Sequence, residues 1–88
     1  MHLLVRMVKP GDIVIDIGAN EGYISLFLAM KVGVNGHIYA IEPNTSNIKA
    51  LQANISLNAL TNISVISRAV SDKYYLSLFF CASLLYCL

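Results

Sequence analysis

The sequence predicts an α/β fold, namely part of a doubly wound parallel sheet with helices packed against it. Three short runs of β-branched residues alternate with two segments of helical character, and about 20 residues join one run to the next. Connections of that length carry a helical crossover, which joins strands that run parallel. A chain of 88 residues has room for one small domain, so the sheet is expected to be incomplete.

The first strand is expected at residues 13–17, where the sequence IVIDI follows a Pro10-Gly11 turn. Such a continuous apolar run is typical of a parallel strand that is covered on both faces. A helix is expected over residues 22–32, because apolar residues recur there three and four positions apart and Gly33 follows. The first part of the chain therefore reads as a strand, a loop and a helix.

The second strand is expected at residues 37–41 and ends before Pro43, because proline has no amide hydrogen for a sheet ladder. Residues 44–46 are Asn, Thr and Ser, all favourable helix N-caps, and the helix that follows is expected to reach about Asn58. A third strand is expected at residues 63–67. The resulting β-α-β-α-β order is typical of a parallel sheet with right-handed crossovers.

The last 15 residues differ in composition from the rest of the chain. Hydrophobic residues make up 57% of the sequence and charged residues 12%, against roughly 45–50% and about 25% in average globular proteins. In residues 74–88, 13 of 15 are hydrophobic and none is charged. A membrane-spanning helix needs about 20 apolar residues, so an extra strand at 74–80, or an aberrant sequence, is favoured over a membrane anchor. We therefore separate a partial domain at residues 1–73 from an apolar tail at 74–88.

Charge and cysteine content argue against several classes of protein. The net charge of +1 disfavours a disordered or nucleic-acid-binding chain. Cys81 and Cys87 form neither a CxxC pair nor a zinc pattern, and His2 and His37 have no ligand-spaced partners, so no metal site is predicted. Residues 1–12 lack the apolar core and cleavage site of a secretory signal. We therefore expect a protein of the reducing cytoplasm.

The segment most informative about function is the loop between the first strand and the first helix, Asp16-Ile17-Gly18-Ala19-Asn20-Glu21-Gly22. Ligands of open parallel sheets bind beyond the carboxyl ends of the strands, at turns of this kind. Gly18 and Gly22 allow a tight turn and the close approach of a ligand, although glycines that only form a turn have the same pattern. Glu42 ends the second strand and is placed to accept hydrogen bonds from ribose hydroxyls. The alternative is a solvated acid at a strand end.

The charge of this loop distinguishes between nucleotide ligands. A pyrophosphate-binding loop has the pattern G-x-G-x-x-G, whereas Asn20 and Tyr23 take the places of its second and third glycines. Tyr23 is as compatible with the core as with a ligand contact. No Lys or Arg lies between Asp16 and Ser25, and Glu21 adds a second carboxylate. Carboxylates repel a pyrophosphate but attract the ammonium and sulfonium groups of S-adenosylmethionine, so the sequence favours this cofactor over NAD.

Four segments, VKPGDIVIDIGANEGYISLFLA, IYAIEPN, LQANISLN and ISRAVSDK, occur in this order within residues 7–73. Together they resemble the start of class I S-adenosylmethionine-dependent methyltransferases, and most of all the FkbM family. The resemblance implies a Rossmann-like sheet of which strands 1 to 3 are present. Asn54 and Asn58 also match the family pattern, and we interpret them as helix-packing and helix-ending residues. The implied cofactor-binding residues are Asp16, Gly18, Ala19, Asn20 and Gly22 at the methionine and ribose end, Glu42 at the ribose hydroxyls, and Ala69 near the adenine.

No segment of the sequence matches the acceptor half that the resemblance implies, so no catalytic residue is assigned. We expect the S-adenosylmethionine-binding portion of a methyltransferase that methylates an oxygen of a small molecule or sugar and is inactive as a fragment. The expected partner is a small-molecule acceptor in the intact parent, without nucleic acid or membrane, and self-association through an exposed sheet edge or the apolar tail is an option. Two alternatives stay open: an NAD(P)-binding oxidoreductase fragment and a non-enzymatic module that oligomerises.

Overall fold

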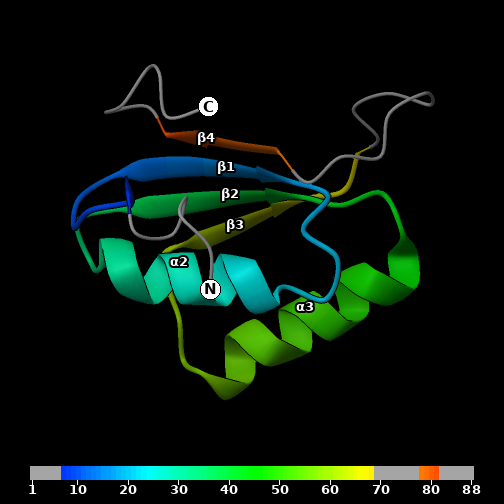
Figure 1. Ribbon diagram of the computed structural model, residues 1–88. Helices are drawn as coiled ribbons and strands as arrows, with labels where there is room; N and C mark the ends of the chain where they lie inside the picture. Colours follow the sequence, from blue (N-terminus) through cyan, green and yellow to red (C-terminus); the bar gives the residue numbers. More distant parts are fainter. Residues whose placement is uncertain (1–6, 69–77, 82–88) are drawn as a thin grey trace.

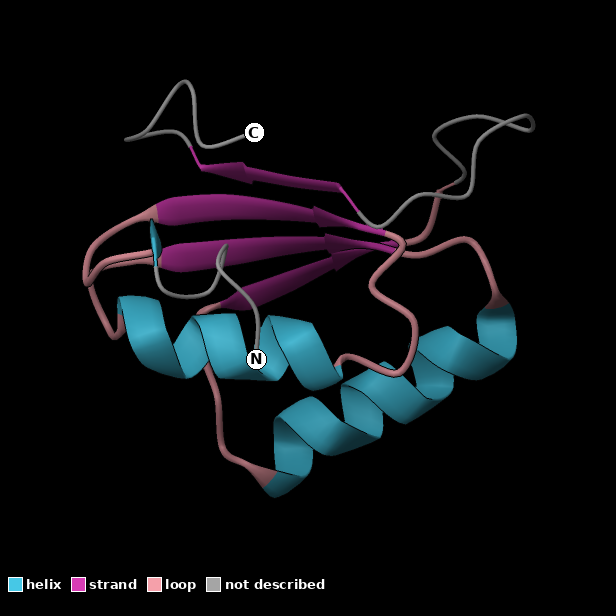
Figure 2. Ribbon diagram, in the orientation of Figure 1, coloured by secondary structure: helices cyan, strands magenta, loops and turns pink. Residues whose placement is uncertain are grey.

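The computed structural model describes residues 7–68 and 78–81. In these ranges one layer of strands lies against one layer of helices (Figure 1, Figure 2). The α/β class predicted from the sequence is confirmed. The elements are, in chain order, β1 (Ile13–Ile17), α2 (Tyr23–Val32), β2 (His37–Ile41), α3 (Thr45–Leu57), β3 (Ile63–Ile66) and β4 (Leu78–Cys81).

The strands form one sheet in the order β3-β2-β1-β4. β1, β2 and β3 are parallel, with Ile13 opposite His37 and Ile38 opposite Ile63. This follows from the two helical crossovers that the sequence predicts. The extra strand expected at 74–80 is β4, which runs antiparallel along the other side of β1. Residues 69–77 and 82–88 lie outside the described part of the chain.

Both helices cover the same face of the sheet (Figure 1). Val14, Ile38 and Ala40 point to that face and are fully buried, whereas Ile13 and Tyr39 on the opposite face are 44% and 37% exposed. The continuous apolar runs predict cover on both faces, and within residues 7–68 and 78–81 this expectation is wrong. The reason is that two successive right-handed crossovers in the same direction place their helices on the same side.

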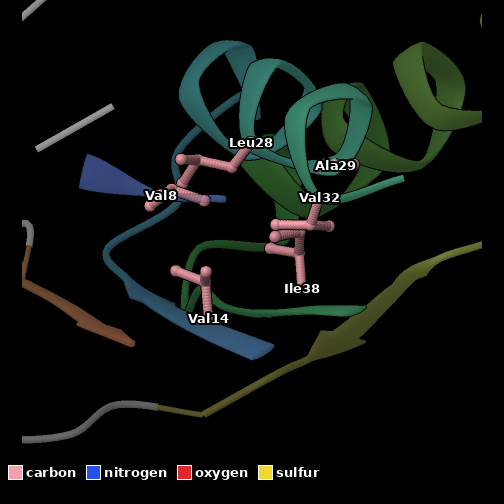
Figure 3. Packing of buried hydrophobic residues seen from close by; sticks show 6 residues of the cluster. All are labelled: Val8, Val14, Leu28, Ala29, Val32 and Ile38. Carbon is pink, nitrogen blue, oxygen red and sulfur yellow. The ribbon is translucent and has the colours of Figure 1, made fainter. Parts of the chain in front are cut away.

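Two buried clusters fix the helices against the sheet. The second cluster surrounds Leu51 of α3 and joins both helices to β2 through Ala19, Leu26 and Ala40. Burying one Leu or Ile side chain contributes about 1.5–3 kcal/mol to the free energy of unfolding. These contacts therefore hold α2 and α3 firmly against β2. The first cluster joins α2 to β1 and β2 and consists of Val8, Val14, Leu28, Ala29, Val32 and Ile38 (Figure 3).

The helix ends agree with the predicted ones because local capping decides them. The side chain of Asn44 accepts a hydrogen bond from the amide of Asn47 at 3.0 Å, as expected of an N-cap. Asn62 donates its side-chain amide to the carbonyl oxygens of Ala29 and Gly33, both at 2.8 Å, and so satisfies the carbonyls at the end of α2. Neither α2 nor α3 has the length and apolar content that a membrane crossing requires.

Candidate cofactor-binding site

The loop from β1 to α2 adopts a backbone that depends on its residue types. Gly18, Asn20 and Gly22 all have positive φ angles, of 76°, 55° and 94°. Glycine adopts this left-handed region freely, and asparagine tolerates it better than most other residues. Gly22 has a second reason to be glycine, because a Cβ there would lie 2.1 Å from Cδ1 of Leu51. The two glycines are therefore turn residues, and Gly22 also allows α3 to approach the loop.

Hydrogen bonds tie this loop to the end of β2. The amides of Gly18 and Ala19 donate to the carbonyl oxygen of Ile41 at 2.9 and 3.1 Å. The amide of Asn20 donates to Oε1 of Glu42 at 2.7 Å. The loop residues and Glu42, which lie more than 20 positions apart in the sequence, thus meet at the carboxyl ends of β1 and β2, where ligands of open parallel sheets bind.

Glu42 is 3% exposed, so the interpretation of this residue as a solvated strand-end acid is wrong. Its Oε2 accepts hydrogen bonds from the amide of Asn44 at 2.9 Å and from the side-chain amide of Asn47 at 3.3 Å. A carboxylate offers about four acceptor positions, of which these two and the Asn20 amide take three. Glu42 therefore joins the loop to the start of α3, and its contacts with the described residues leave one acceptor position on Oε1.

Asp16 is a buried acid beneath the loop. It is 2% exposed, and the hydroxyl of Ser25 on α2 donates a hydrogen bond to its Oδ2. Burial raises the pKa of Asp16 from 3.8 to about 6, the Ser25 hydrogen bond lowers it, and the nearby charge of Glu42 raises it. A buried carboxylate whose ionised form is this costly is stabilised by a cation placed beside it.

A cavity of about 230 Å³ opens between the loop and the start of α2. Of the residues predicted to bind a cofactor, Glu42 is not in its wall and Ala69 lies outside the described residues. Tyr23 is 69% exposed and lines the cavity, so it does not belong to the core. The lining residues are Asp16, Gly18, Ala19, Asn20, Glu21, Gly22, Tyr23 and Ile24.

Two residues of this site were not recognised from the sequence pattern. Ser25 is fully buried against Asp16, and the only signal for it is a hydroxyl amid the apolar residues of a helix. Asn54 is predicted only as a helix-packing residue, and its side-chain amide donates to the carbonyl oxygen of Glu21 in the loop at 3.0 Å. Asn58 does end the helix as predicted, since it is the C-cap of α3.

Residues 2–77, which include this loop and Glu42, match the family model of the TRM5/TYW2 methyltransferase domain. The chain belongs to this methyltransferase family. The assignment to class I S-adenosylmethionine-dependent methyltransferases is thereby confirmed, whereas the narrower resemblance to the FkbM family stays a prediction.

Relatives and solved structures agree with this family. The chain is 32% identical over 65 residues to a ribosomal protein L11 methyltransferase of Caldanaerobacter subterraneus, covering 74% of this chain and 20% of the relative. The structure of a candidate rRNA methylase from Clostridium thermocellum has a TM-score of 0.71 and 25% identity, over 75% of this chain and 36% of that one. A candidate protein-L-isoaspartate O-methyltransferase of Plasmodium falciparum, solved with S-adenosyl-L-homocysteine, has a TM-score of 0.65 and 25% identity, over 76% and 35%.

The comparisons overturn the expected partners. The similar proteins include a methyltransferase of a ribosomal protein and a candidate rRNA methylase. The prediction of a small-molecule acceptor without nucleic acid is therefore wrong. The exclusion of nucleic acid rested on the net charge of +1. That charge carries no information on the acceptor, because the chain spans only a fifth to about a third of the length of these relatives.

Proposed function

We propose that residues 1–73 bind S-adenosylmethionine as the cofactor half of a methyltransferase, and that residues 74–88 form a separate tail. The observation that carries the proposal is the buried carboxylate of Asp16 in the wall of a cavity that no Lys or Arg of the described residues lines. A cationic cofactor offsets the cost of that buried charge, whereas a pyrophosphate increases it. The alternative of an NAD(P)-binding fragment is disfavoured for this reason.

The residues around the cavity suit the charges at the amino-acid end of S-adenosylmethionine. Asp16 is the proposed partner of the cationic groups. The first amides of α2 are the proposed partners of the carboxylate, because Gly22 caps this helix without a side-chain hydrogen bond. The acceptor position left on Oε1 of Glu42 suits a ribose hydroxyl.

The size of the cavity limits which part of the cofactor it holds. A volume of about 230 Å³ is below the roughly 300–1,000 Å³ of a pocket for a drug-sized ligand. We assign to it the methionine and ribose end, contacted by Gly18, Ala19, Asn20 and Gly22. The adenine contact proposed at Ala69 stays a prediction, and so does the FkbM resemblance.

When bound, S-adenosylmethionine supplies a methyl group activated by its sulfonium. The residues of this chain bind and orient that group, and no catalytic residue is proposed. The acceptor proposed for the intact parent is a protein, in line with the name of the L11 methyltransferase relative. Transfer to oxygen and location in the cytoplasm stay predictions.

Isothermal titration calorimetry of the full 88-residue chain with S-adenosylmethionine, S-adenosylhomocysteine and NAD tests the proposal. We expect binding of the first two and none of NAD. Asp16→Asn is expected to weaken S-adenosylmethionine binding about 10- to 100-fold, because it removes a charge-assisted contact of about 1.5–3 kcal/mol.

Lys31→Gln is the control, because Lys31 is an exposed charged residue in the last turn of α2 and lies outside the cavity wall. We expect it to change the affinity less than about threefold, since solvent screens an exposed charge. Circular dichroism confirms that both variants fold. A wild-type chain that binds neither cofactor form, or an equal loss of affinity in both variants, contradicts the proposal.

A further inference from the structure

Three side chains on one face of α3 contact the two segments that build the cofactor site. Asn47, Leu51 and Asn54 are four and three positions apart, which places them on one side of the helix. We call these three residues the α3 seat. In Figure 1 the loop that leaves β1 runs past α3 before it enters α2.

Each residue of the α3 seat makes a different contact. The side-chain amide of Asn54 donates to the carbonyl oxygen of Glu21 at 3.0 Å. Leu51 is fully buried and packs against Gly22, where an added Cβ would require the Leu51 side chain to shift. Asn47 donates to Oε2 of Glu42 at 3.3 Å. The seat thus contacts both the loop and the carboxylate to which the loop is tied.

The loop needs such support because its backbone is unfavourable. Asn20 has a left-handed conformation, which costs free energy in any residue other than glycine. Residues held in such conformations keep them only where their surroundings impose them. The side-chain amide of Asn54 donates a hydrogen bond to the carbonyl oxygen of Glu21. Glu21 lies between Asn20 and Gly22, the second and third residues of the loop with a positive φ angle.

We propose that Asn54 is a positioning residue that holds the loop in its cofactor-binding conformation before the cofactor arrives. The inference rests on the proposed function, and it adds that α3 preorganises the site. Without the Asn54 amide the loop samples other conformations, and binding then has to order it. That ordering cost lowers affinity although no contact with the cofactor is lost.

The test combines affinity with amide hydrogen exchange on the full chain. In Asn54→Ala we expect an affinity for S-adenosylhomocysteine about fivefold weaker than in the wild type, the effect of one hydrogen bond. We also expect faster exchange of the Asn20 amide, which the structure shows bound to Glu42. A purely helical role predicts neither change, because alanine is a better helix former than asparagine.

Two further variants make the test specific. Gln52→Ala is the control, because Gln52 is an exposed amide of the same helix whose side chain has no hydrogen bond within residues 7–68 and 78–81. It is expected to leave affinity and loop exchange unchanged. Asn54→Gln keeps the donor group and is expected to recover part of both properties.

The two proposals fail in different ways. Asn54→Ala with wild-type affinity and wild-type exchange of Asn20 overturns the role of Asn54 and leaves the proposed function intact. A wild-type chain that binds no S-adenosylhomocysteine overturns the proposed function. In that case the exchange measurement, which needs no ligand, still decides whether Asn54 holds the loop.

Discussion

At the scale of single residues, Asp16 is the described residue whose pKa folding clearly shifts. Its carboxyl group is buried beneath the loop and has one hydroxyl donor, Ser25. Burial raises its pKa to about 6, so part of the population is protonated in mildly acidic solution. Both stability and cofactor binding should therefore depend on pH through this one residue.

The sign of the stability effect follows from the direction of the shift. A raised pKa means that the folded chain favours the protonated acid, so the contribution of Asp16 to stability is present below pH 3.8 and is lost as the pH rises through about 6. The rise of the pKa from 3.8 to about 6 corresponds to about 3 kcal/mol in the free energy of unfolding. We expect urea unfolding from pH 4 to 7 to show this loss in the wild type and not in Asp16→Asn.

Cofactor binding should have the opposite pH dependence, because only the ionised acid attracts a cation. The affinity for S-adenosylmethionine is expected to rise from pH 5 to 7.5 in the wild type and to be flat in Asp16→Asn. The same slope in both proteins would assign the dependence to another group.

At the scale of elements, the packing of α3 against the loop depends on the absence of a side chain at Gly22. Gly11 and Gly22 have similar positive φ angles, of 89° and 94°, but an added Cβ meets Leu51 at Gly22 and meets nothing within 4 Å at Gly11. The pair therefore separates backbone strain from steric overlap. Gly11→Ala measures the strain alone, and Gly22→Ala measures the strain together with overpacking.

We expect Gly11→Ala to lower the free energy of unfolding by about 1–2 kcal/mol, the cost of an alanine with a positive φ angle. Gly22→Ala should cost about 1–3 kcal/mol more, because the core around Leu51 has to move. Urea unfolding of both variants measures the difference. Equal costs would show that α3 yields without penalty and would weaken the case for a close contact at the loop.

At the scale of the whole molecule, β4 is the part of the apolar tail that the structure describes. It pairs with β1 on the side opposite β2, where β1 would otherwise present an unpaired edge. Unpaired edges are sites of aggregation. Residues 78–81 therefore cover the β1 edge in this structure.

Removal of residues 74–88 tests this role. We expect a chain that ends at residue 73 to melt at a lower temperature and to aggregate more, because β1 loses the partner strand that it has in the structure. Thermal unfolding and light scattering measure the two effects. A truncated chain as stable and as monodisperse as the full one would show that the tail is dispensable.

The sequence by itself determined the order of strands and helices, the position of the loop and the class of family. These properties follow from local signals: apolar runs, capping residues, and glycines where the backbone turns. The family model and the strand order agree with them. The acceptor could not be predicted, because the chain spans a minor part of its relatives.

Only the tertiary structure decided which side chains meet in the site. The carboxylate of Glu42 accepts a hydrogen bond from the backbone amide of Asn20. The hydroxyl of Ser25 donates a hydrogen bond to Asp16. The side-chain amide of Asn54 donates a hydrogen bond to the carbonyl oxygen of Glu21. Each pair joins residues from different elements. Helical and strand periodicity fix the face on which a side chain lies, whereas its partner depends on how the elements pack.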